Sequence, residues 1–361
     1  MADSNDPGSG AVPAASRPGA AATGGPPAID PVAVIRSRQY IGALVLAAIV
    51  GIPISAIAYG FLALVAAIQH FLFSELPNQL FGSPAPAWWP VPWLALCGLL
   101  TALVIRYLPG NAGHSPAFGF QTGGGPPTAS QLPGVVLAAL ATLSLGAVLG
   151  PEAPLIAIGG GLGALTVRLA NKDAPPMAQT IMASAGSFAA ISTLLGSPVL
   201  GAFLIMEVAG IGGAMLSLVT LPGLLASGIG ALVFVGLDNW TGLGTFSLAL
   251  PSVPPAVPPT LATLVWALVI GVVCALFGWL IRSVGLWLRP IVHLNRLLVT
   301  SALGLIIGLT AMTYQLISGL SFTQVLFSGQ DALPELVEKA ADYSVGVLIL
   351  LVVCKAFVYG L

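Results

Sequence analysis

Long stretches of apolar residues constrain this chain more than any other feature. A segment of roughly 17–25 apolar residues can cross a bilayer as an α-helix. In lipid, only helices and closed barrels satisfy their own backbone polar groups, and the sequence lacks the short alternating strands of a barrel. We therefore predict an all-α, polytopic membrane protein. Its apolar runs occupy about residues 40–74, 91–108, 133–149, 151–170, 178–195, 198–209, 214–237, 260–288, 297–318 and 344–361.

The composition of the 361-residue chain also excludes a soluble domain. Hydrophobic residues make up 57% of the sequence and charged residues only 6%. Soluble domains carry about 25% charged residues, so a soluble chain this apolar would be unable to cover its own surface. The net charge of −1 indicates no nucleic-acid partner.

The cysteines give no sign of a metal or cofactor site. Cys97, Cys274 and Cys354 each lie in an apolar run, without a CxxC pattern or histidine spacing. We interpret them as buried small hydrophobic residues, and we expect no metal and no cofactor.

The first 36 residues differ from the rest of the chain. They are rich in Ala, Gly, Pro and Ser and contain no aromatic residue, so they bury too little apolar surface to become ordered. They also lack the basic start and apolar core of a signal peptide. We predict a disordered tail over 1–36 and one transmembrane domain over 37–361. Arg17, Arg36 and Arg38 precede the first run, so we expect the N-terminus on the cytoplasmic side of the cell membrane.

Several apolar runs are partial or begin at a proline. Pro133, Pro151 and Pro198 start such runs, and the run 198–209 is too short to cross a bilayer. Proline is tolerated in the first turn of a helix. Partial helices at membrane depth occur where they are buried in protein or line a cavity. Transporters direct the N-termini of such helices at anions, so this pattern favours anion transport.

Two isolated acids stand within these apolar runs. Glu152 is the only ionisable residue between Pro133 and Arg168, and Glu207 is the only one between Ala174 and Leu237. A carboxylate in lipid is costly, so each is expected to face the protein interior or water. Glu152 either caps a helix N-terminus or competes with an anion for the same N–H donors. For Glu207 we favour a structural hydrogen bond inside the helix bundle.

The residues around Glu152 resemble a motif of a known family. GPEAP at 150–154, followed by IGGGLGAL, is similar to the GREGP segment of the CLC chloride channels and proton/chloride antiporters. The resemblance implies that Glu152 is the gating glutamate. Pro151 and Ala153 replace the family's arginine and second glycine. The anion-binding residues implied here are Gly150, Pro151, Glu152, Ala153 and Pro154.

A second segment resembles another helix of the same family. PVLGAFLIMEV at 198–208 is similar to the helix that the family writes as PLAGILFxxEE. The first acid of that pair falls on Glu207, the second intramembrane acid, and the second falls on Val208. In proton-coupled members the second acid transfers protons internally. Its replacement by valine therefore argues against coupled proton transport.

A third segment is similar to the family's GSGIP motif, whose serine contacts the central anion. AGHSP at 112–116 matches this motif, and GGGPP at 123–127 lies too close to Glu152 to be preferred. The serine position falls on Gly113, and Ser115 stands two residues further on. The implied anion-binding residues of this segment are Gly113, His114, Ser115 and Pro116.

The resemblance covers most of the chain from about residue 40. It implies a CLC-like fold with tilted and partial helices, an inverted repeat, and a homodimer with one pore in each subunit. The final run, 344–361, is similar to the helix before the family's GxFxP segment, so we expect the second repeat to be incomplete. Lys355 in that run is interpreted as a snorkelling or helix-end residue.

The implied function is transport of chloride or a similar anion through a pore gated by Glu152. Val208 favours a CLC-type, voltage-gated anion channel over the alternative, a proton/chloride antiporter. A non-conducting, truncated family member is a further alternative. An intramembrane enzyme would need a nucleophile–base pair or paired carboxylates. The isolation of Glu152 and Glu207 argues against an enzyme.

Overall fold

A computed structural model describes residues 31–82, 85–110, 126–208, 214–249, 258–330 and 332–361. All regular secondary structure in these residues is helical, as predicted. The α-helices are α1 (Pro31–Ile35), α2 (Arg38–His70), α3 (Leu76–Phe81), α4 (Pro90–Tyr107), α5 (Leu132–Ser144), α6 (Glu152–Ala170), α7 (Pro176–Ala190), α8 (Pro198–Val208), α9 (Ala214–Thr241), α10 (Leu261–Leu294), α11 (Arg296–Ser318), α12 (Ala332–Glu338) and α13 (Val345–Gly360). A π-helical turn, η1 (Phe71–Glu75), joins α2 to α3, and the short 3₁₀ helices η3 (Phe322–Gln324) and η4 (Ala340–Asp342) flank α12.

The long helices confirm the prediction of a polytopic membrane protein. Six helical segments among the described residues are long and apolar enough to cross a bilayer. The helices α5 and α13 are apolar but shorter. The six spans are Arg38–Phe81, Pro90–Tyr107, Glu152–Ala170, Leu218–Thr241, Leu261–Leu294 and Arg296–Ser318.

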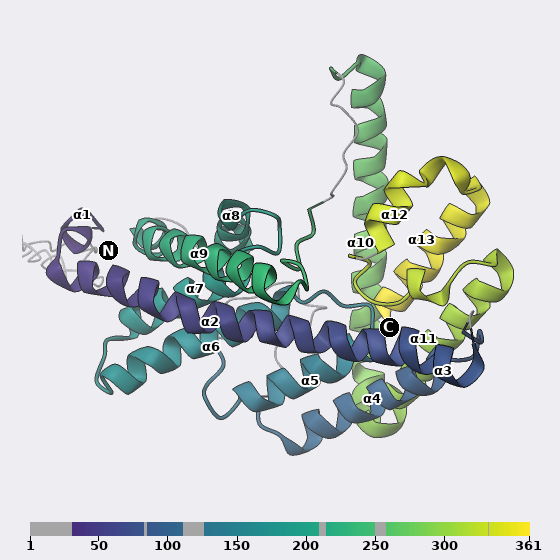
Figure 1. The fold of residues 1–361 in the computed structure, drawn as a ribbon, viewed down its shortest axis with the longest axis horizontal. Helices are drawn as coiled ribbons and strands as arrows, with labels where there is room; N and C mark the ends of the chain where they lie inside the picture. The colour runs from purple at the N-terminus through teal and green to yellow at the C-terminus, as the bar shows by residue number, and fades with distance from the viewer. Residues whose placement is uncertain (1–30, 83–84, 111–125, 209–213, 250–257, 331) are drawn as a thin grey trace, which may run out of the picture.

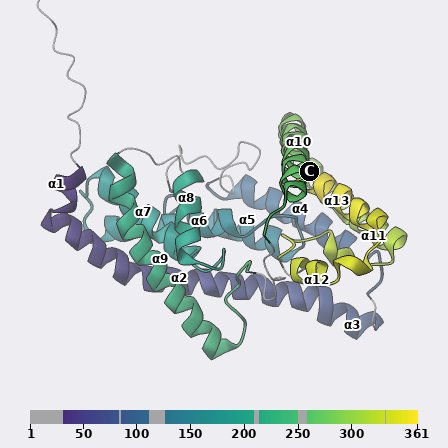
Figure 2. The ribbon, with the colours of Figure 1, turned by 90° about the horizontal axis from the view of Figure 1, so that it is seen from above.

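The described helices pack around two hydrophobic cores. The first core joins α2 and α5–α9, and the second joins η1, α4, α11, the region of η3 and α13. Helix α2 runs along the length of the molecule (Figure 1; Figure 2). Residues of α2 belong to the first core, and residues of its continuation, η1, belong to the second. Helix α10 projects away from this body.

Proline and glycine set several helix ends. Pro133 lies in the first turn of α5, Pro151 is the residue before α6, and Pro198 begins α8. Helix α5 ends at Ser144, whereas the apolar run predicted helix to about residue 149. The apolar run extends beyond the end of the helix because Gly146 has a left-handed conformation, with a φ of 100°, which an α-helix cannot include.

The N-terminal boundary also differs from the prediction. Helix α1 falls inside the segment 1–36 that was expected to be disordered. Val34 and Ile35 are half-buried and pack against the first core, which provides the apolar contact that orders this turn. Ser37 then caps α2 by accepting a hydrogen bond from the N–H of Tyr40 at 3.1 Å. Residues 1–30 lie outside the described part of the chain.

Glycines bring two helix pairs into backbone contact. On α6, Gly159 and Gly163 face the main chain of α7, and a Cβ on Gly163 would lie 2.9 Å from the carbonyl carbon of Met182. Gly98 of α4 meets α11 in the same way, 2.8 Å from the carbonyl carbon of Thr300. Small residues allow such close approach in lipid, where van der Waals packing holds helices together. Close approach at glycine therefore joins α6 to α7 and α4 to α11.

Gly163→Ala is expected to lower the stability of the folded protein. The added methyl group collides with main-chain atoms of Met182, which cannot rotate away. Overpacking of this kind costs typically about 1–3 kcal/mol. The measurement is the midpoint of heat-induced loss of the monodisperse peak in size-exclusion chromatography. Gly236→Ala on α9 is the matched control, because a Cβ there meets nothing within 4 Å. Equal midpoints for the two variants would contradict the packing argument.

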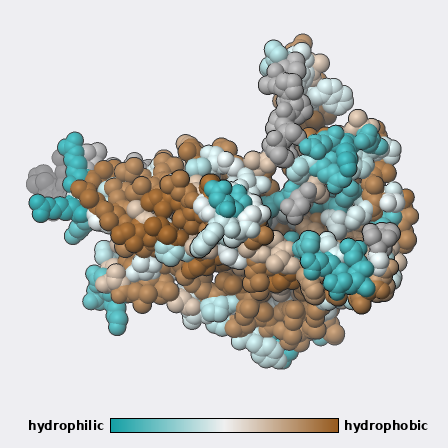
Figure 3. All heavy atoms as spheres, in the orientation of Figure 1, coloured by the Kyte–Doolittle hydropathy of each residue, from teal (hydrophilic) through white to brown (hydrophobic). Residues whose placement is uncertain are grey.

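Much of the described surface is apolar, as expected for a protein surrounded by lipid. Figure 3 shows that hydrophobic residues cover much of one face. Helix α10 is the extreme case, since none of its most apolar stretch is buried. Cys274 lies exposed on this helix, so its interpretation as a buried residue was wrong. An apolar side chain on an outward helix face needs no protein partner when lipid is the solvent.

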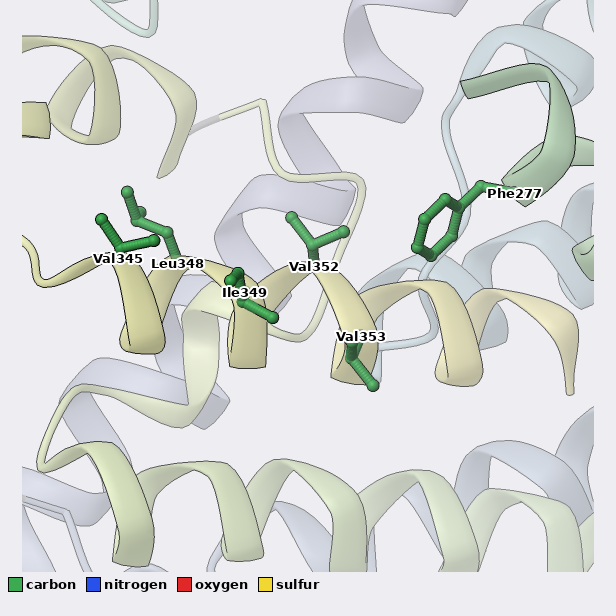
Figure 4. A pocket seen from close by; sticks show the side chains of 6 residues that line it. All are labelled: Phe277, Val345, Leu348, Ile349, Val352 and Val353. Atoms are coloured by element: carbon green, nitrogen blue, oxygen red, sulfur yellow. The ribbon is translucent and has the colours of Figure 1, made fainter. Parts of the chain in front are cut away.

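An apolar groove of about 350 Å³ lies between α10 and α13 (Figure 4). A site for an anion needs N–H or O–H donors, or positive charge, and the side chains around this groove provide none. The groove is therefore not the anion site. Its lining residues are Phe277, Val345, Leu348, Ile349, Val352 and Val353.

Candidate anion site

Glu152 is the first residue of α6, directly after Pro151. The first N–H groups of a helix have no partner within the helix, and the helix dipole is positive at this end. The side chain of Glu152 is half-buried, and its neighbours Pro151 and Leu155 are buried. The lone acid found in the sequence thus lies where a helix attracts negative charge.

The carboxylate of Glu152 folds back over Gly150. A Cβ built on Gly150 would lie 2.6 Å from Cδ of Glu152 and 2.9 Å from its Oε1. Glycine at 150 is what leaves room for this conformation. The carboxylate therefore occupies the kind of position that a bound anion takes at a helix N-terminus.

Glu152 lies at the junction of the two hydrophobic cores. Leu143 of α5 belongs to the first core, and Leu145 and Val148 in the following link belong to the second. The chain then returns to the first core at Leu149, which packs against it, and at the buried Leu155 of α6. The link 145–151 therefore places the N-terminus of α6 between the two halves, at a position that neither half determines alone.

Helix α6 is held firmly behind this N-terminus. Ser187 of α7 is buried, and its hydroxyl group donates a hydrogen bond to the carbonyl oxygen of Ile156 at 3.0 Å. A Cβ on Gly160 would lie 2.9 Å from the same hydroxyl oxygen. The hydroxyl satisfies a carbonyl one turn into α6, while the first N–H groups of the helix stay directed toward its N-terminal end.

Glu207 has a different setting. Helix α8 packs through the buried Ala202 and Met206, which leaves Glu207 exposed. No hydrogen bond reaches its carboxylate from the described residues, so the interpretation of a structural hydrogen bond inside the bundle was wrong. The short helix presents one face to α7 and α9, and Glu207 lies on the other.

The structure tests the remaining site predictions only in part. Gly150, Pro151, Glu152, Ala153 and Pro154 lie together at the start of α6, where Ala153 is exposed and Pro154 half-buried. The other implied anion-binding residues lie outside the described part of the chain, and their role stays a prediction. They are Gly113, His114, Ser115 and Pro116. Among the described residues, no group of three or more His, Cys, Asp or Glu side chains comes together to hold a metal.

Comparisons with known proteins identify the family of this chain. The family model described as voltage gated chloride channel matches residues 119–361, which is more than half of the chain. Similar curated proteins include the putative ion-transport protein YfeO of Salmonella newport and of Salmonella typhimurium, each 33% identical over 161 residues. These matches span 45% of this chain and 38% of the relatives' own length.

Two solved structures share the fold. One is a slow cyanobacterial Cl⁻/H⁺ antiporter, with a TM-score of 0.66 and 20% identity, over 88% of this chain and 73% of the other. The second is a CLC-type fluoride/proton antiporter, with a TM-score of 0.61 and 18% identity, over 90% of this chain and 77% of the other. These similarities confirm the predicted all-α, CLC-like membrane fold. With the family match over residues 119–361, they establish that the chain belongs to the voltage-gated chloride channel (CLC) family.

Proposed function

We propose that this protein carries chloride, or a similar small anion, across the membrane along a path that the side chain of Glu152 closes. The observation that carries the proposal is the carboxylate of Glu152 at the N-terminus of α6, folded over Gly150. Membership of the CLC family supports anion transport as the activity.

The mechanism follows from competition for one set of donors. A helix N-terminus binds an anion by partial positive charge, without the tight hold of a full cation. In the closed state, we expect the carboxylate of Glu152 to take the place of the anion at the N-terminus of α6. When the carboxyl group is protonated or swings away, an anion takes its place. Anion flow is therefore expected to increase as the pH falls.

A passive, gated channel is the favoured form of this activity. The proton-transfer acid that coupled CLC proteins carry corresponds to Val208, whose side chain cannot hold a proton. The second candidate is a proton/anion antiporter. The two structural neighbours are antiporters for Cl⁻/H⁺ and for fluoride/proton, which favours this candidate, and Glu152 itself can carry a proton.

We also propose a homodimer in the cell membrane with a cytoplasmic N-terminus. The family resemblance supports the dimer with one pore in each subunit. Arg36 precedes the first span and Arg38 begins it, which supports the orientation through the positive-inside rule. The proposed voltage dependence follows from a charged gate inside the membrane field.

Chloride efflux from liposomes that contain the purified protein, with the external pH recorded at the same time, tests the proposal. Efflux without proton movement supports the channel. Efflux coupled to a fixed ratio of proton uptake supports the antiporter and shows that Val208 does not block the proton route. Efflux no greater than from empty liposomes contradicts the proposed function.

A further inference from the structure

Lys355 does not behave as the snorkelling residue that the sequence suggested. It lies half-buried on α13, and its ammonium group points to main-chain carbonyl oxygens at the end of η3 and in the turn that follows it. The accepting oxygens belong to Gln324 at 3.1 Å, Leu326 at 3.3 Å and Phe327 at 3.4 Å. A lysine ammonium has three N–H donors, so this turn satisfies all of them.

The turn that Lys355 holds is unusual in its backbone. Phe327 has a φ of 57°, a left-handed conformation that is uncommon for a residue other than glycine. Gly329 has a φ of 89°, and a Cβ there would lie 3.1 Å from Nζ of Lys355. Such conformations persist where the surrounding structure holds them. The convergence of three carbonyl groups on one cation is one of the contacts that do so here.

The same turn packs on the link that leads to Glu152. The N–H of Phe327 donates a hydrogen bond to the carbonyl oxygen of Gly146 at 3.3 Å. A Cβ on Gly146 would lie 3.4 Å from Cδ1 of Leu326 and 3.4 Å from the ring of Phe73. Phe73 in turn packs edge-on against the ring of Phe327, with centroids 5.1 Å apart.

These contacts form a continuous physical connection. Leu326 is fully buried in the second core, together with Leu145 and Val148 of the link. The link 145–151 is short and leads directly into Glu152, so its position sets where α6 begins. A displacement of the turn therefore moves the link 145–151, and it does so without acting directly on the side chain of Glu152.

We infer that Lys355 is a positioning residue for Glu152: it fixes the turn 324–327, which braces the link 145–151 and with it the N-terminus of α6. The effect of this brace on anion flow rests on the proposed function. The brace itself is a structural relation that can be measured without any transport assay.

Hydrogen–deuterium exchange of the full chain in lipid nanodiscs measures the brace directly. Lys355→Met removes the cation but keeps an unbranched apolar chain. We expect amide exchange about tenfold faster both in 320–330 and in 145–152, and unchanged exchange in α7. Lys355→Arg keeps N–H donors and is expected to restore at least part of the protection. Lys339→Met is the matched control, since Lys339 pairs with Glu335 on the surface at 2.8 Å.

Two outcomes of this experiment overturn the inference. Faster exchange in 320–330 alone would mean that Lys355 shapes its own turn without bracing the link. Faster exchange throughout the protein, α7 included, would mean that the substitution merely destabilises the fold.

Chloride efflux then tests the consequence for the gate. Lys355→Met is expected to change the ratio of efflux at about pH 4.5 to efflux at about pH 7.5 by about fivefold when Glu152 is present. In a Glu152→Gln background the same substitution is expected to have no effect. An equal fractional change in both backgrounds overturns the positioning role. If Glu152→Gln alone matches the wild type, or no efflux is seen, the proposed function fails, and the exchange experiment still decides whether Lys355 braces the link.

Discussion

Glu152→Gln is expected to raise chloride efflux at about pH 7.5 by roughly 5- to 30-fold and to remove its dependence on pH. An anionic group at a partly buried helix N-terminus gains about 1–2 kcal/mol, which corresponds to this factor. The neutral amide gives up most of that attraction but keeps the size of the side chain. The measurement is chloride efflux from liposomes at about pH 7.5, where an ordinary glutamate is fully ionised, and at about pH 4.5, close to its ordinary pKa.

The sign of the pH effect is part of this prediction. In the wild type, protonation removes the competing charge, so efflux rises as the pH falls. In the glutamine variant no proton is taken up at this position, so the two efflux rates become equal. Glu207→Gln is the matched control, because it removes the other intramembrane acid from an exposed position on α8. A Glu152→Gln protein that retains the wild-type pH response would contradict the assignment of Glu152 as the gate.

Hydrophobic length predicted most of the helices in this protein. The run 297–318 corresponds to α11 (Arg296–Ser318), and the short run 198–209 corresponds to α8 (Pro198–Val208). Apolar length is informative here because, in lipid, the backbone must satisfy its own hydrogen bonds, so an apolar run becomes a helix. Helix α12 was missed, since ALPELVE carries two acids and forms no apolar run.

The sequence also located Glu152, because one charge in a long apolar stretch is a strong signal. It correctly predicted that the acid lies at the start of a helix after Pro151. It did not predict that Glu207 is exposed, since a single charge gives no information about which face of a short helix packs inward. The prediction for 113–116 stays open, because these residues lie outside the described part of the chain.

The sequence did not predict the contacts that support the site. Lys355 and its carbonyl partners are separated by 28 to 31 residues, and no motif connects them. The contact between Phe327 and Gly146 joins still more distant segments. A lysine near a helix end in an apolar run has the same pattern whether it snorkels to the surface or binds a turn. Only the packing of the second core distinguishes the two.

Gly150→Ala is expected to disturb the gate while leaving the fold intact. The added methyl group overlaps the carboxylate end of Glu152, which can rotate away, and not a rigid main-chain group as at Gly163. The backbone at Gly150 has no positive φ, so alanine fits there without strain. The substitution raises the free energy of the closed conformation of the Glu152 side chain by about 0.5–1.5 kcal/mol.

We therefore expect Gly150→Ala to raise chloride efflux at about pH 7.5 by roughly 3- to 10-fold, because the closed conformation of Glu152 becomes less favourable. The thermal midpoint is expected to match that of Gly236→Ala, and not the lower value of Gly163→Ala. In a Glu152→Ala background, Gly150→Ala has no carboxylate to displace and is expected to leave efflux unchanged. An effect of equal size in that background would mean that Gly150 acts on the path through the backbone and not through the side chain of Glu152. Gly150→Ala creates a clash that the Glu152 side chain can relieve by rotating. Gly163→Ala creates a clash with the main chain of α7, which cannot rotate away.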